Sequence, residues 1–467
     1  MVFSSLFFLF FFLPANLLLY YLVPNRSLQN LILVIFSLVF YAWGEPIWVG
    51  LLVFSAFVDY LNGIFIDRFR GRPLARIGIV STVFFNIGIL MTFKYSDFIV
   101  ENVNFLFGTG FEKPGFMLPI GISFYTFQTI SYTIDVYRGE VPAQRSFMKF
   151  LLFVSLYHQL VAGPIVRYSH IANEIDNRIF RLRDFSSGIN RFCRGLFKKV
   201  CIANIAGSIS IQFLMTDKEH TTVFGEWYGL TLFALQIYFD FSGYSDMAIG
   251  LGRMFGFHYH ENFKHPYIAR SIADFWRRWH ISLQTFFRDY VYIPLGGNRK
   301  RAVLNIFIVW SLTGLWHGAS WNFVLWGLYF GLLLFIEKKL LAGFLERAPV
   351  IIRHLYALPL ILFSWSLFYF TDLGDLTSFI KTAFHTTSAA LYDVKLQSSI
   401  KENMYWIPFT LILCMPVYDK IFKLIERVFK SSLLTSSLTM IFNLVLFSLS
   451  VLLLVGSSYN PFLYFRF

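Results

Sequence analysis

The sequence predicts an all-α membrane protein that crosses the bilayer many times. Of its 467 residues, 56% are hydrophobic and only 14% are charged, and the mean hydropathy is +0.58. A chain with so little charge cannot fold as a water-soluble globule, so most of its surface faces lipid or other helices. Apolar stretches also recur from one end to the other, many of them near the ~20 residues that a helix needs to cross a ~30 Å hydrocarbon layer.

These stretches leave no room for a separate soluble domain. We predict one polytopic transmembrane domain over residues 1–467, with about 11–13 membrane segments and some of them re-entrant or broken. The apolar stretches are 3–23, 29–43, 47–66, 77–93, 116–134, 149–164, 192–214, 225–251, 302–316, 320–337, 352–371, 403–418 and 434–455.

The loops between the first segments indicate their orientation. Arg26 lies in the first loop, Glu45 in the second, four arginines between 68 and 76 in the third, and three acids between 97 and 112 in the fourth. Because basic loops favour the cytoplasm, this alternation places the N-terminus outside and the arginine-rich loops inside.

The alternation fails around 149–164, where both flanking loops are basic. That stretch is short and contains His158, Gln159, Gly163 and Pro164. Irregular backbone at membrane depth is tolerated only where protein or water satisfies it, so we expect a re-entrant segment that lines a chamber. Polar and helix-breaking residues in 116–134 support the same interpretation.

A cluster of polar side chains interrupts the stretch 225–251. Tyr238, Asp240, Ser245 and Asp246 occur in YFDFSGYSDMAIG. Because a charged side chain at the bilayer centre costs ~2.5–3.5 kcal/mol on insertion scales, such residues are usually functional. These groups are candidates to orient a histidine or to bind a polar part of a substrate.

The stretches 302–316 and 320–337 predict a helical hairpin with His317 at its turn. Together they run about 35 residues, or ~52 Å as one helix, which is too long for a single crossing. Basic residues at 299–301 and 338–339 place both open ends on the cytoplasmic side, and His317 deep in the membrane or near its outer boundary. A histidine there is suited to act as general base on an acceptor hydroxyl, although a helix-capping histidine is the ordinary alternative.

His280 has a different setting, in the run DFWRRWH from Asp274 to His280. The charges around it predict a position on the cytoplasmic side. Arg277 and Arg278 could bind the phosphates of an anionic donor such as coenzyme A, or anchor the segment to lipid headgroups.

Other site classes have little support. The three cysteines, Cys193, Cys201 and Cys414, form no CxxC pair and read as small buried hydrophobes, and we predict no metal site even at the HxHx4H pattern from His258 to His265. No P-loop or nucleophile elbow is present. The net charge of +13 comes from residues scattered between apolar segments, which indicates cytoplasmic loops and anionic lipid and argues against nucleic acid as a partner.

A set of short motifs across the chain resembles the membrane-bound O-acyltransferase (MBOAT) family, in its bacterial polysaccharide-acetylating branch. Each motif alone is weak, but together they run from the first residue to the last. They are MVFSS (1–5), LPIGISFY (118–125), YTIDVYR (132–138), AGP (162–164), YFDFSGYSDMAIG (238–250), ENF (261–263), PY (266–267), FWRRWHISL (275–283), RDY (288–290), LGGNR (295–299), GLWHG (314–318) and NPFLYF (460–465).

This resemblance implies a ring of helices around a thin central funnel, with the donor reached from the cytoplasm and the acceptor from outside. It implies that His317 and His280 are catalytic. The candidate substrate-binding residues are Asp246, Ser245, Tyr238, Asp274, Arg277, Arg278, Trp316 and Asn298.

The implied reaction moves an acyl group, most simply acetyl from acetyl-CoA, to a hydroxyl of a cell-surface polysaccharide or peptidoglycan. No bound cofactor is expected. The resemblance also implies a bacterial cytoplasmic (inner) membrane location and an extracytoplasmic SGNH-type acyltransferase partner. The aromatic-rich segment 459–467 is a candidate contact for that partner or an interfacial anchor.

Two alternatives stay open at this point. One is D-alanyl transfer from a carrier protein, a reaction of the same family. The other is a transporter of a lipid-linked sugar, which would need internal symmetry between its halves, and we find no convincing repeat. The motifs do not identify the polymer.

Overall fold

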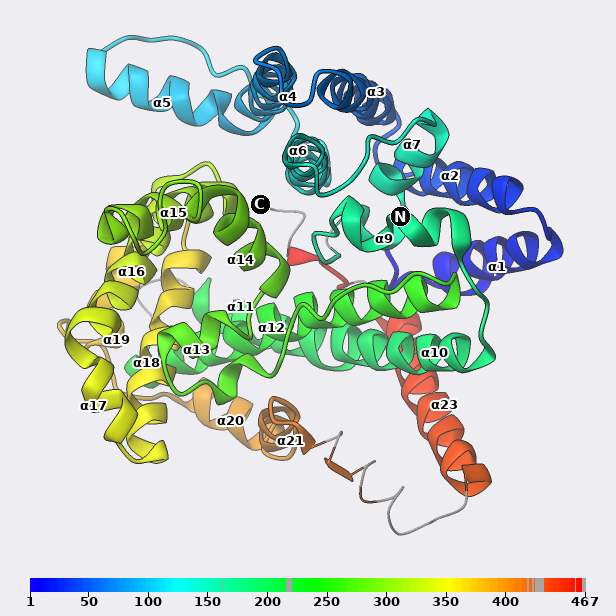
Figure 1. The fold of residues 1–467 in the computed structure, drawn as a ribbon. Helices are drawn as coiled ribbons and strands as arrows, with labels where there is room; N and C mark the ends of the chain where they lie inside the picture. Colours follow the sequence, from blue (N-terminus) through cyan, green and yellow to red (C-terminus); the bar gives the residue numbers. More distant parts are fainter. Residues whose placement is uncertain are drawn as a thin grey trace. The chain divides into compact units, whose positions relative to one another are not determined.

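A computed structural model describes residues 1–161, 163–215, 221–417, 420–421, 424, 432–457 and 459–463. Throughout these residues the regular structure is helical and contains no strand (Figure 1). The predicted all-α class is therefore confirmed.

Four described helical segments are long and apolar enough to cross a membrane: Trp48–Arg68, Ala75–Phe107, Val350–Tyr369 and Leu434–Gly456. Three shorter apolar helices, Phe8–Leu22, Arg26–Ala42 and Ala302–His317, add to them. The protein is thus a multi-pass membrane protein, and the predicted 11–13 segments stay a prediction.

The chain packs as two compact units, each made of two separate stretches of sequence. Unit 1 contains Met1–Phe192 and Tyr244–Glu261, and unit 2 contains Cys193–Gly243 and Asn262–Phe467. Two helices, α10 (Leu182–Phe197) and α12 (Val223–Met254), contribute residues to both units.

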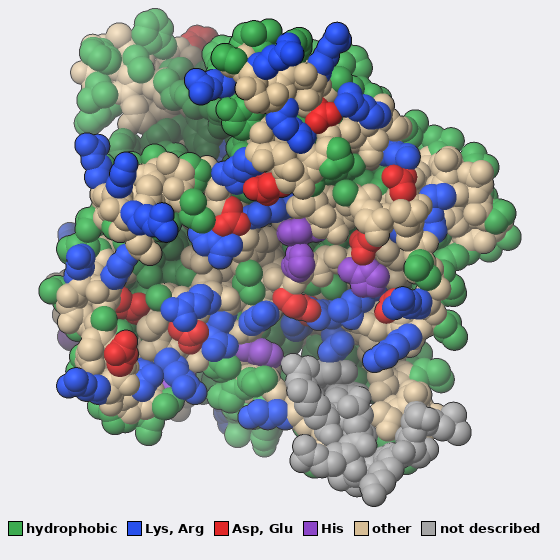
Figure 2. Space-filling model, in the orientation of Figure 1, with side chains coloured by type: hydrophobic (Ala, Val, Ile, Leu, Met, Phe, Trp, Pro, Cys, Tyr) green, Lys and Arg blue, Asp and Glu red, His purple; other side chains and the backbone are tan. Residues whose placement is uncertain are grey.

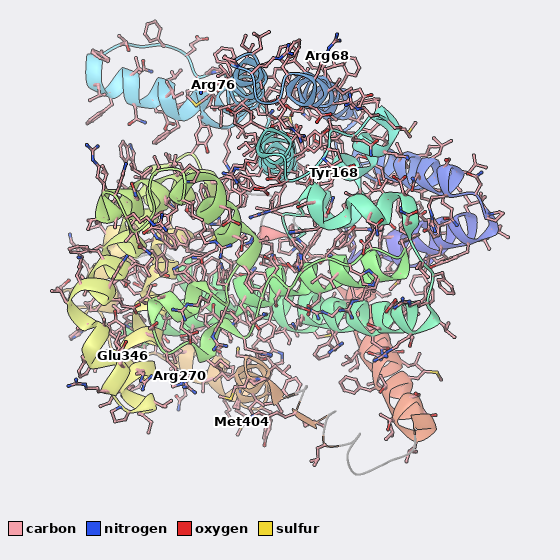
Figure 3. All side chains as sticks on the ribbon, in the orientation of Figure 1. Arg68, Arg76, Tyr168, Arg270, Glu346 and Met404 are labelled. Atoms are coloured by element: carbon pink, nitrogen blue, oxygen red, sulfur yellow. The ribbon has the colours of Figure 1, made fainter. Side chains whose placement is uncertain are left out.

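Unit 1 begins with antiparallel apolar helices. Its elements before α10 are η1 (Phe8–Phe12), α1 (Leu13–Leu22), α2 (Arg26–Ala42), α3 (Trp48–Arg68), α4 (Ala75–Leu90), η2 (Met91–Tyr95), α5 (Ser96–Phe107), α6 (Ile122–Arg138), α7 (Phe147–Ser155), α8 (Tyr157–Leu160) and α9 (Tyr168–Asn177). Helices α3, α4 and α6 lie side by side (Figure 1). Arg68 and Arg76 mark the linked ends of α3 and α4 (Figure 3).

Buried polar side chains join α3, α4 and α6. The Nδ2 of Asn86 donates to Asp59 Oδ2 at 2.8 Å, and Thr129 Oγ1 donates to Asn86 Oδ1 at 3.3 Å. All three side chains are fully buried. The apolar period of these helices therefore hides a polar seam that composition alone does not reveal.

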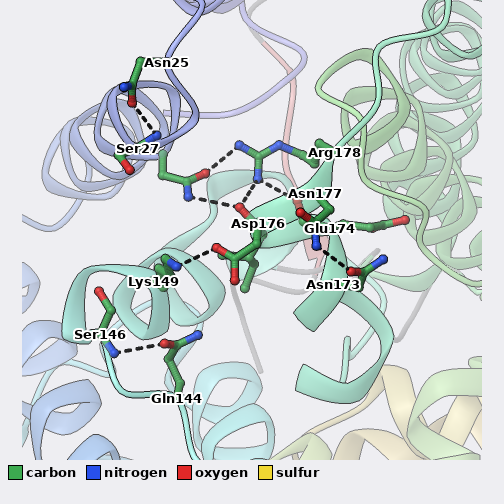
Figure 4. Close-up of polar contacts among 12 residues, drawn as sticks. Asn25, Ser27, Gln144, Ser146, Lys149, Asn173, Glu174, Asp176, Asn177 and Arg178 are labelled. Carbon is green, nitrogen blue, oxygen red and sulfur yellow. Dashed lines mark hydrogen bonds and ion pairs between the residues drawn. The ribbon is translucent and has the colours of Figure 1, made fainter.

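Arg178 closes the other end of unit 1. Its guanidinium donates to Tyr20 Oη at 3.1 Å and to Asn30 Oδ1 at 2.5 Å. Nearby, Lys149 pairs with Asp176 at 2.6 Å (Figure 4). These contacts connect the start of the chain with the segment after α9.

The stretch 149–164 forms a broken helix, as its sequence predicts. Helix α7 ends at Ser155, Leu156 takes an extended conformation with ψ 112°, and α8 follows as one short turn. His158 and Gln159 are fully buried there. The predicted helix break is confirmed, and re-entry into the membrane stays a prediction.

Unit 2 carries the larger set of aromatic side chains. Besides its part of α12, its elements are η3 (Lys198–Ala203), α11 (Asn204–Leu214), η5 (Pro266–Ile268), α13 (Ile272–Trp276), α14 (Ile281–Phe287), η6 (Arg288–Tyr292), α15 (Ala302–His317), α16 (Trp321–Ile336), η7 (Glu337–Leu341), α17 (Ala342–Arg347), α18 (Val350–Tyr369), α19 (Leu373–Ala383), α20 (Val394–Glu402), α21 (Trp406–Leu413) and α23 (Ser432–Gly456). Its core contains Trp276, Trp279, Trp326 and Trp365, each at most 2% exposed.

The three cysteines are free and buried, as predicted. Basic side chains are spread over the face drawn in Figure 2 and are interspersed with apolar ones. Among the described residues, no group of three His, Cys, Asp or Glu side chains could hold a metal ion.

Candidate functional site

The hairpin that carries His317 is confirmed. Helices α15 and α16 pack along their length (Figure 1), and only a three-residue turn separates them. Close packing depends on glycine, because a Cβ on Gly314 would overlap the carbonyl oxygen of Phe323 and one on Gly327 would overlap that of Trp310. Two helices that approach this closely form one rigid support for the residue at their tip.

His317 is the last residue of α15 and is 3% exposed. Its ring meets Trp326 at 5.0 Å and 82°, and Phe368 at 5.3 Å and 75°. Edge-to-face contacts of this kind fix the plane of an aromatic ring. The imidazole is thus held in one orientation by α16 and α18.

His280 lies on a tight turn between α13 and α14. Its backbone is left-handed, with φ 43° and ψ 55°, and its side chain is fully buried. A non-glycine residue in this conformation is strained and commonly marks a functional site. The turn directs the imidazole into unit 2, while Arg277, three residues earlier, is exposed.

Asn262 determines which nitrogen of His280 carries the proton. Asn262 Oδ1 accepts from the backbone N–H of Ser282 at 3.2 Å and from Ser282 Oγ at 2.9 Å, so this atom is the carbonyl oxygen of the amide. It lies 3.2 Å from His280 Nδ1. Nδ1 therefore donates, and in the neutral ring Nε2 holds the lone pair.

His280 lies outside the candidate spans, and burial lowers its pKa to about 3. The ring is consequently neutral near pH 7. In this tautomer Nε2 can accept a hydrogen bond or a proton, but it cannot donate one to a developing oxyanion.

Trp316 lies against both histidines. Its ring centre is 5.8 Å from that of His280 and 5.0 Å from that of His317. The charge pattern predicts opposite depths for the two histidines, and this separation is wrong, because both rings contact one indole. The arginines that suggested a cytoplasmic position lie on the outward side of the turn, and His280 points the other way.

Asp274 and Arg278 form an ion pair one helical turn apart, with 3.0 Å between Oδ1 and Nε. Asp274 Oδ2 also accepts the backbone N–H of Arg270. These two predicted site residues therefore stabilise the α13 turn. Arg277 is exposed beside them and is the arginine better able to meet an anion.

Glu337 connects the base of the hairpin to α13. Its Oε2 accepts from Ala273 N at 2.9 Å, and its Oε1 accepts from Ile272 N. The carboxylate is 6% exposed and binds the first N–H groups of α13, where negative charge is favourable. The segment that bears His280 is thereby fixed to the hairpin that bears His317.

The remaining predicted residues fall in different places. Tyr238 is buried in unit 2 and its ring packs on Tyr267 at 5.3 Å and on Trp279 at 6.2 Å. Asn298 is exposed, and its Oδ1 accepts from Tyr292 Oη and Lys338 Nζ. Asn298 thus supports the turn before α15 and does not lie in the histidine cluster.

Asp246 and Ser245 belong to unit 1, where both are buried. Asp246 Oδ1 pairs with Arg191 at 2.6 Å, and Arg191 also binds Glu261, with 2.9 Å to Oε1. Asp246 therefore belongs to a buried charge network of unit 1.

Sequence inspection missed a second buried ion pair, which holds the end of the described chain. Lys199 Nζ lies 2.7 Å from Asp240 Oδ1, and both side chains are at most 3% exposed. Lys199 also donates to the carbonyl of Pro461, and Asp240 Oδ2 accepts from Leu463 N at 2.9 Å. A lysine inside the apolar stretch 192–214 was the available signal.

The segment 459–463 consequently packs inside unit 2. Phe462 and Leu463 are 7% and 6% exposed, so this part of the predicted partner-binding tail is buried. Residues 464–467, the rest of that tail, lie outside the described residues.

Two cavities of unit 2 adjoin the aromatic cluster. The larger, of about 480 Å³, is lined in part by Phe368, which touches His317. The smaller, of about 200 Å³, lies beside Trp276 and Trp310 and is also lined by Thr313, one turn before His317. A volume of about 300–1,000 Å³ is usual for small-molecule sites, so the larger cavity is the better candidate for a substrate.

Comparison with known proteins agrees with this geometry. The family model of the membrane-bound O-acyltransferase family matches residues 140–374, which include both histidines. The chain is 43% identical to the probable alginate O-acetylase AlgI of Azotobacter vinelandii, over 79% of this chain and 75% of the relative. It is 32% identical to the peptidoglycan O-acetyltransferase of Helicobacter pylori, over 100% of this chain and 98% of the relative.

A more distant match is the teichoic acid D-alanyltransferase of Bacillus subtilis, at 28% identity over 47% of this chain and 60% of the relative. The matches cover most of the helical chain and the hairpin with its terminal histidine. The protein is an acyltransferase enzyme, and it belongs to the membrane-bound O-acyltransferase family.

Proposed function

We propose that the enzyme transfers an acetyl group from a thioester, acetyl-CoA, to a hydroxyl of a cell-surface polysaccharide or peptidoglycan. The observation that carries this proposal is the pair His317 and His280 around Trp316, in a buried site with a substrate-sized cavity beside it. We place the enzyme in the bacterial cytoplasmic membrane, with the donor on the cytoplasmic side.

His317 acts as general base in this mechanism. As the acceptor oxygen attacks the thioester carbonyl, its proton moves to the imidazole, the new C–O bond forms and the C–S bond breaks. The proton then passes to the leaving thiolate, which departs as the free thiol of coenzyme A. General base catalysis of this kind typically contributes 10²–10⁴-fold.

His280 has a role that follows from its tautomer. Because Nδ1–H is donated to Asn262, Nε2 is available to accept a hydrogen bond from a substrate hydroxyl or from the coenzyme thiol. This replaces the expectation that His280 stabilises an oxyanion. Arg277, the exposed arginine of the same segment, is our candidate for the donor phosphates.

The polymer and the partner are further parts of the proposal. The relatives named as alginate and peptidoglycan O-acetyltransferases support a glycan acceptor, and their identities support acetyl over D-alanyl transfer. We also expect an extracytoplasmic SGNH-type acyltransferase that works with this enzyme on the polymer.

Purified full-length protein in lipid nanodiscs tests the reaction. The measurement is release of the coenzyme A thiol from acetyl-CoA, together with O-acetylation of added glycan. We expect His317→Gln to lower both by at least about 10²-fold, while His258→Gln, which removes an exposed histidine paired with Glu174, has no effect. A carrier protein charged with D-alanine is the comparison donor, and preference for it over acetyl-CoA would contradict the acetyl assignment.

A further inference from the structure

The larger cavity of unit 2 combines aromatic walls with a buried acid. Phe233, Tyr369, Phe379 and Tyr459 contribute rings, and Gln236 and Glu226 contribute polar groups. Gln236 and Tyr459 pack over Gly207, where a Cβ would overlap the Gln236 amide. Aromatic faces combined with a few polar groups are typical of sites that bind sugar rings, since a ring offers C–H faces to stack and hydroxyls to hydrogen-bond.

Glu226 has no partner that explains its burial. It lies in the first turn of α12 and is 5% exposed. Among the residues that the structure describes, none forms a hydrogen bond with its Oε2. A buried carboxylate oxygen without a partner is costly, and a ligand with hydroxyl groups in the cavity would satisfy it.

The cavity also leads to the catalytic histidine. Phe368 forms part of its wall, and the ring of Phe368 is 5.3 Å from the ring of His317. A ligand in the cavity is therefore separated from the proposed general base by a single side chain.

We propose that this cavity is the acceptor subsite, and that Glu226 binds hydroxyl groups of an uncharged sugar unit there. The charge of the lining limits the choice of sugar. Two carboxylates, those of Glu226 and Asp375, line the cavity, and its described lining contains no Lys, Arg or His side chain. Like charges at short range repel strongly where water is scarce, so a uronic acid is a poor ligand.

This inference rests on the proposed function and narrows it. Alginate carries a carboxylate on every sugar, whereas the cavity of this protein favours neutral sugars. The charge of the cavity, rather than the names of the relatives, is the basis for this acceptor class.

The test uses full-length protein in nanodiscs, with acetyl-CoA as donor and two soluble acceptors of equal length, a neutral β-glucan trisaccharide and a tri-uronate. Initial rates give kcat and KM for each acceptor, and thiol release without acceptor gives donor turnover. Binding of the labelled trisaccharide without donor is measured separately. The variants are Glu226→Ala and Glu226→Gln, and the control is Glu346→Gln, which changes an exposed acid on α17 (Figure 3).

We expect the wild type to acetylate the neutral sugar in preference to the uronate. Glu226→Ala should raise KM for the neutral sugar about tenfold or more and weaken its binding, with donor turnover unchanged, because hydrogen bonds to a charged group are lost. Glu226→Gln keeps one carbonyl oxygen and should fall between the two while reducing discrimination against the uronate. Glu346→Gln should match the wild type.

Three results would overturn the inference: equal rates with both acceptors in the wild type, unchanged KM in both Glu226 variants, or acyl transfer to a partner protein with none to either sugar. Donor turnover that depends on His317 separates these results from failure of the proposed function. If Glu226→Ala unfolds, the glutamine variant and the binding measurement decide the question.

Discussion

The indole of Trp316 packs edge-on against the imidazole of His280, with 5.8 Å between ring centres and 61° between planes. The same indole borders His317, its neighbour in sequence. A change at Trp316 should therefore disturb both histidines together.

Trp316→Phe keeps a ring at this position, whereas Trp316→Ala leaves a space. We expect kcat to fall about 10²-fold in the alanine variant and much less in the phenylalanine variant, because small displacements of catalytic groups are costly. In a double-mutant cycle, Trp316→Ala and His280→Gln should be strongly non-additive. Additive losses would indicate that Trp316 does not position His280.

The hairpin places both of its open ends on one side of the membrane. In a background in which Cys193, Cys201 and Cys414 are replaced, a cysteine at Arg299 or Lys339 should be labelled only from the cytoplasm. Labelling uses impermeant maleimide on intact cells and on inverted vesicles. If the two positions react from opposite sides, the segment crosses the membrane once and the depth of His317 must be revised.

The buried pair Lys199 and Asp240 should be expensive to break. Asp240→Ala leaves a lysine without its carboxylate and should lower the free energy of unfolding by about 3–5 kcal/mol, whereas Lys199→Met with Asp240→Leu should lose much less. Thermal unfolding in detergent measures both. A loss for the double variant as large as for Asp240→Ala would argue against the ion pair as the cause.

Stability should depend on pH through His280. Because its folded pKa of about 3 lies below the ordinary value of about 6.5, the unfolded chain binds a proton between these values that the folded chain does not. Stability from this group is complete above about pH 6.5 and falls as the pH decreases toward 3. His280→Gln, which can still donate to Asn262, should flatten the slope by about 1.4 kcal/mol per pH unit, the value for one proton. Melting curves from pH 4 to pH 8 would show this, and equal slopes would assign the acid sensitivity to other groups.

The sequence was informative where a local pattern determines structure. The length of 302–337, its glycines and its flanking charges predicted the hairpin and the place of His317 correctly. The helix break in 149–164 followed equally from its short length and from residues such as His158 and Pro164. Both features depend on residues close together in the chain.

Contacts between distant residues could not be predicted in this way. Nothing in the sequence pairs Lys199 with Asp240, or places Phe368 between His317 and a cavity. The depth of His280 was misjudged because loop charge reports where arginines lie, whereas the left-handed turn at His280 decides where the imidazole points. Asn298 and Asp246 belong to motifs, but their contacts support turns and charge networks.

The carboxylate of Glu337 gives the catalytic pair a mechanical property. It fastens the start of α13 to the foot of the hairpin, and Trp316 braces the same two elements at the histidines. A structure pinned at two points resists both hinging and sliding, so the histidines move as one body. Room for an arriving or departing substrate must then come from the opposite walls, the end of α18 and the segment 459–463, while the spacing of the two imidazoles stays constant through the catalytic cycle.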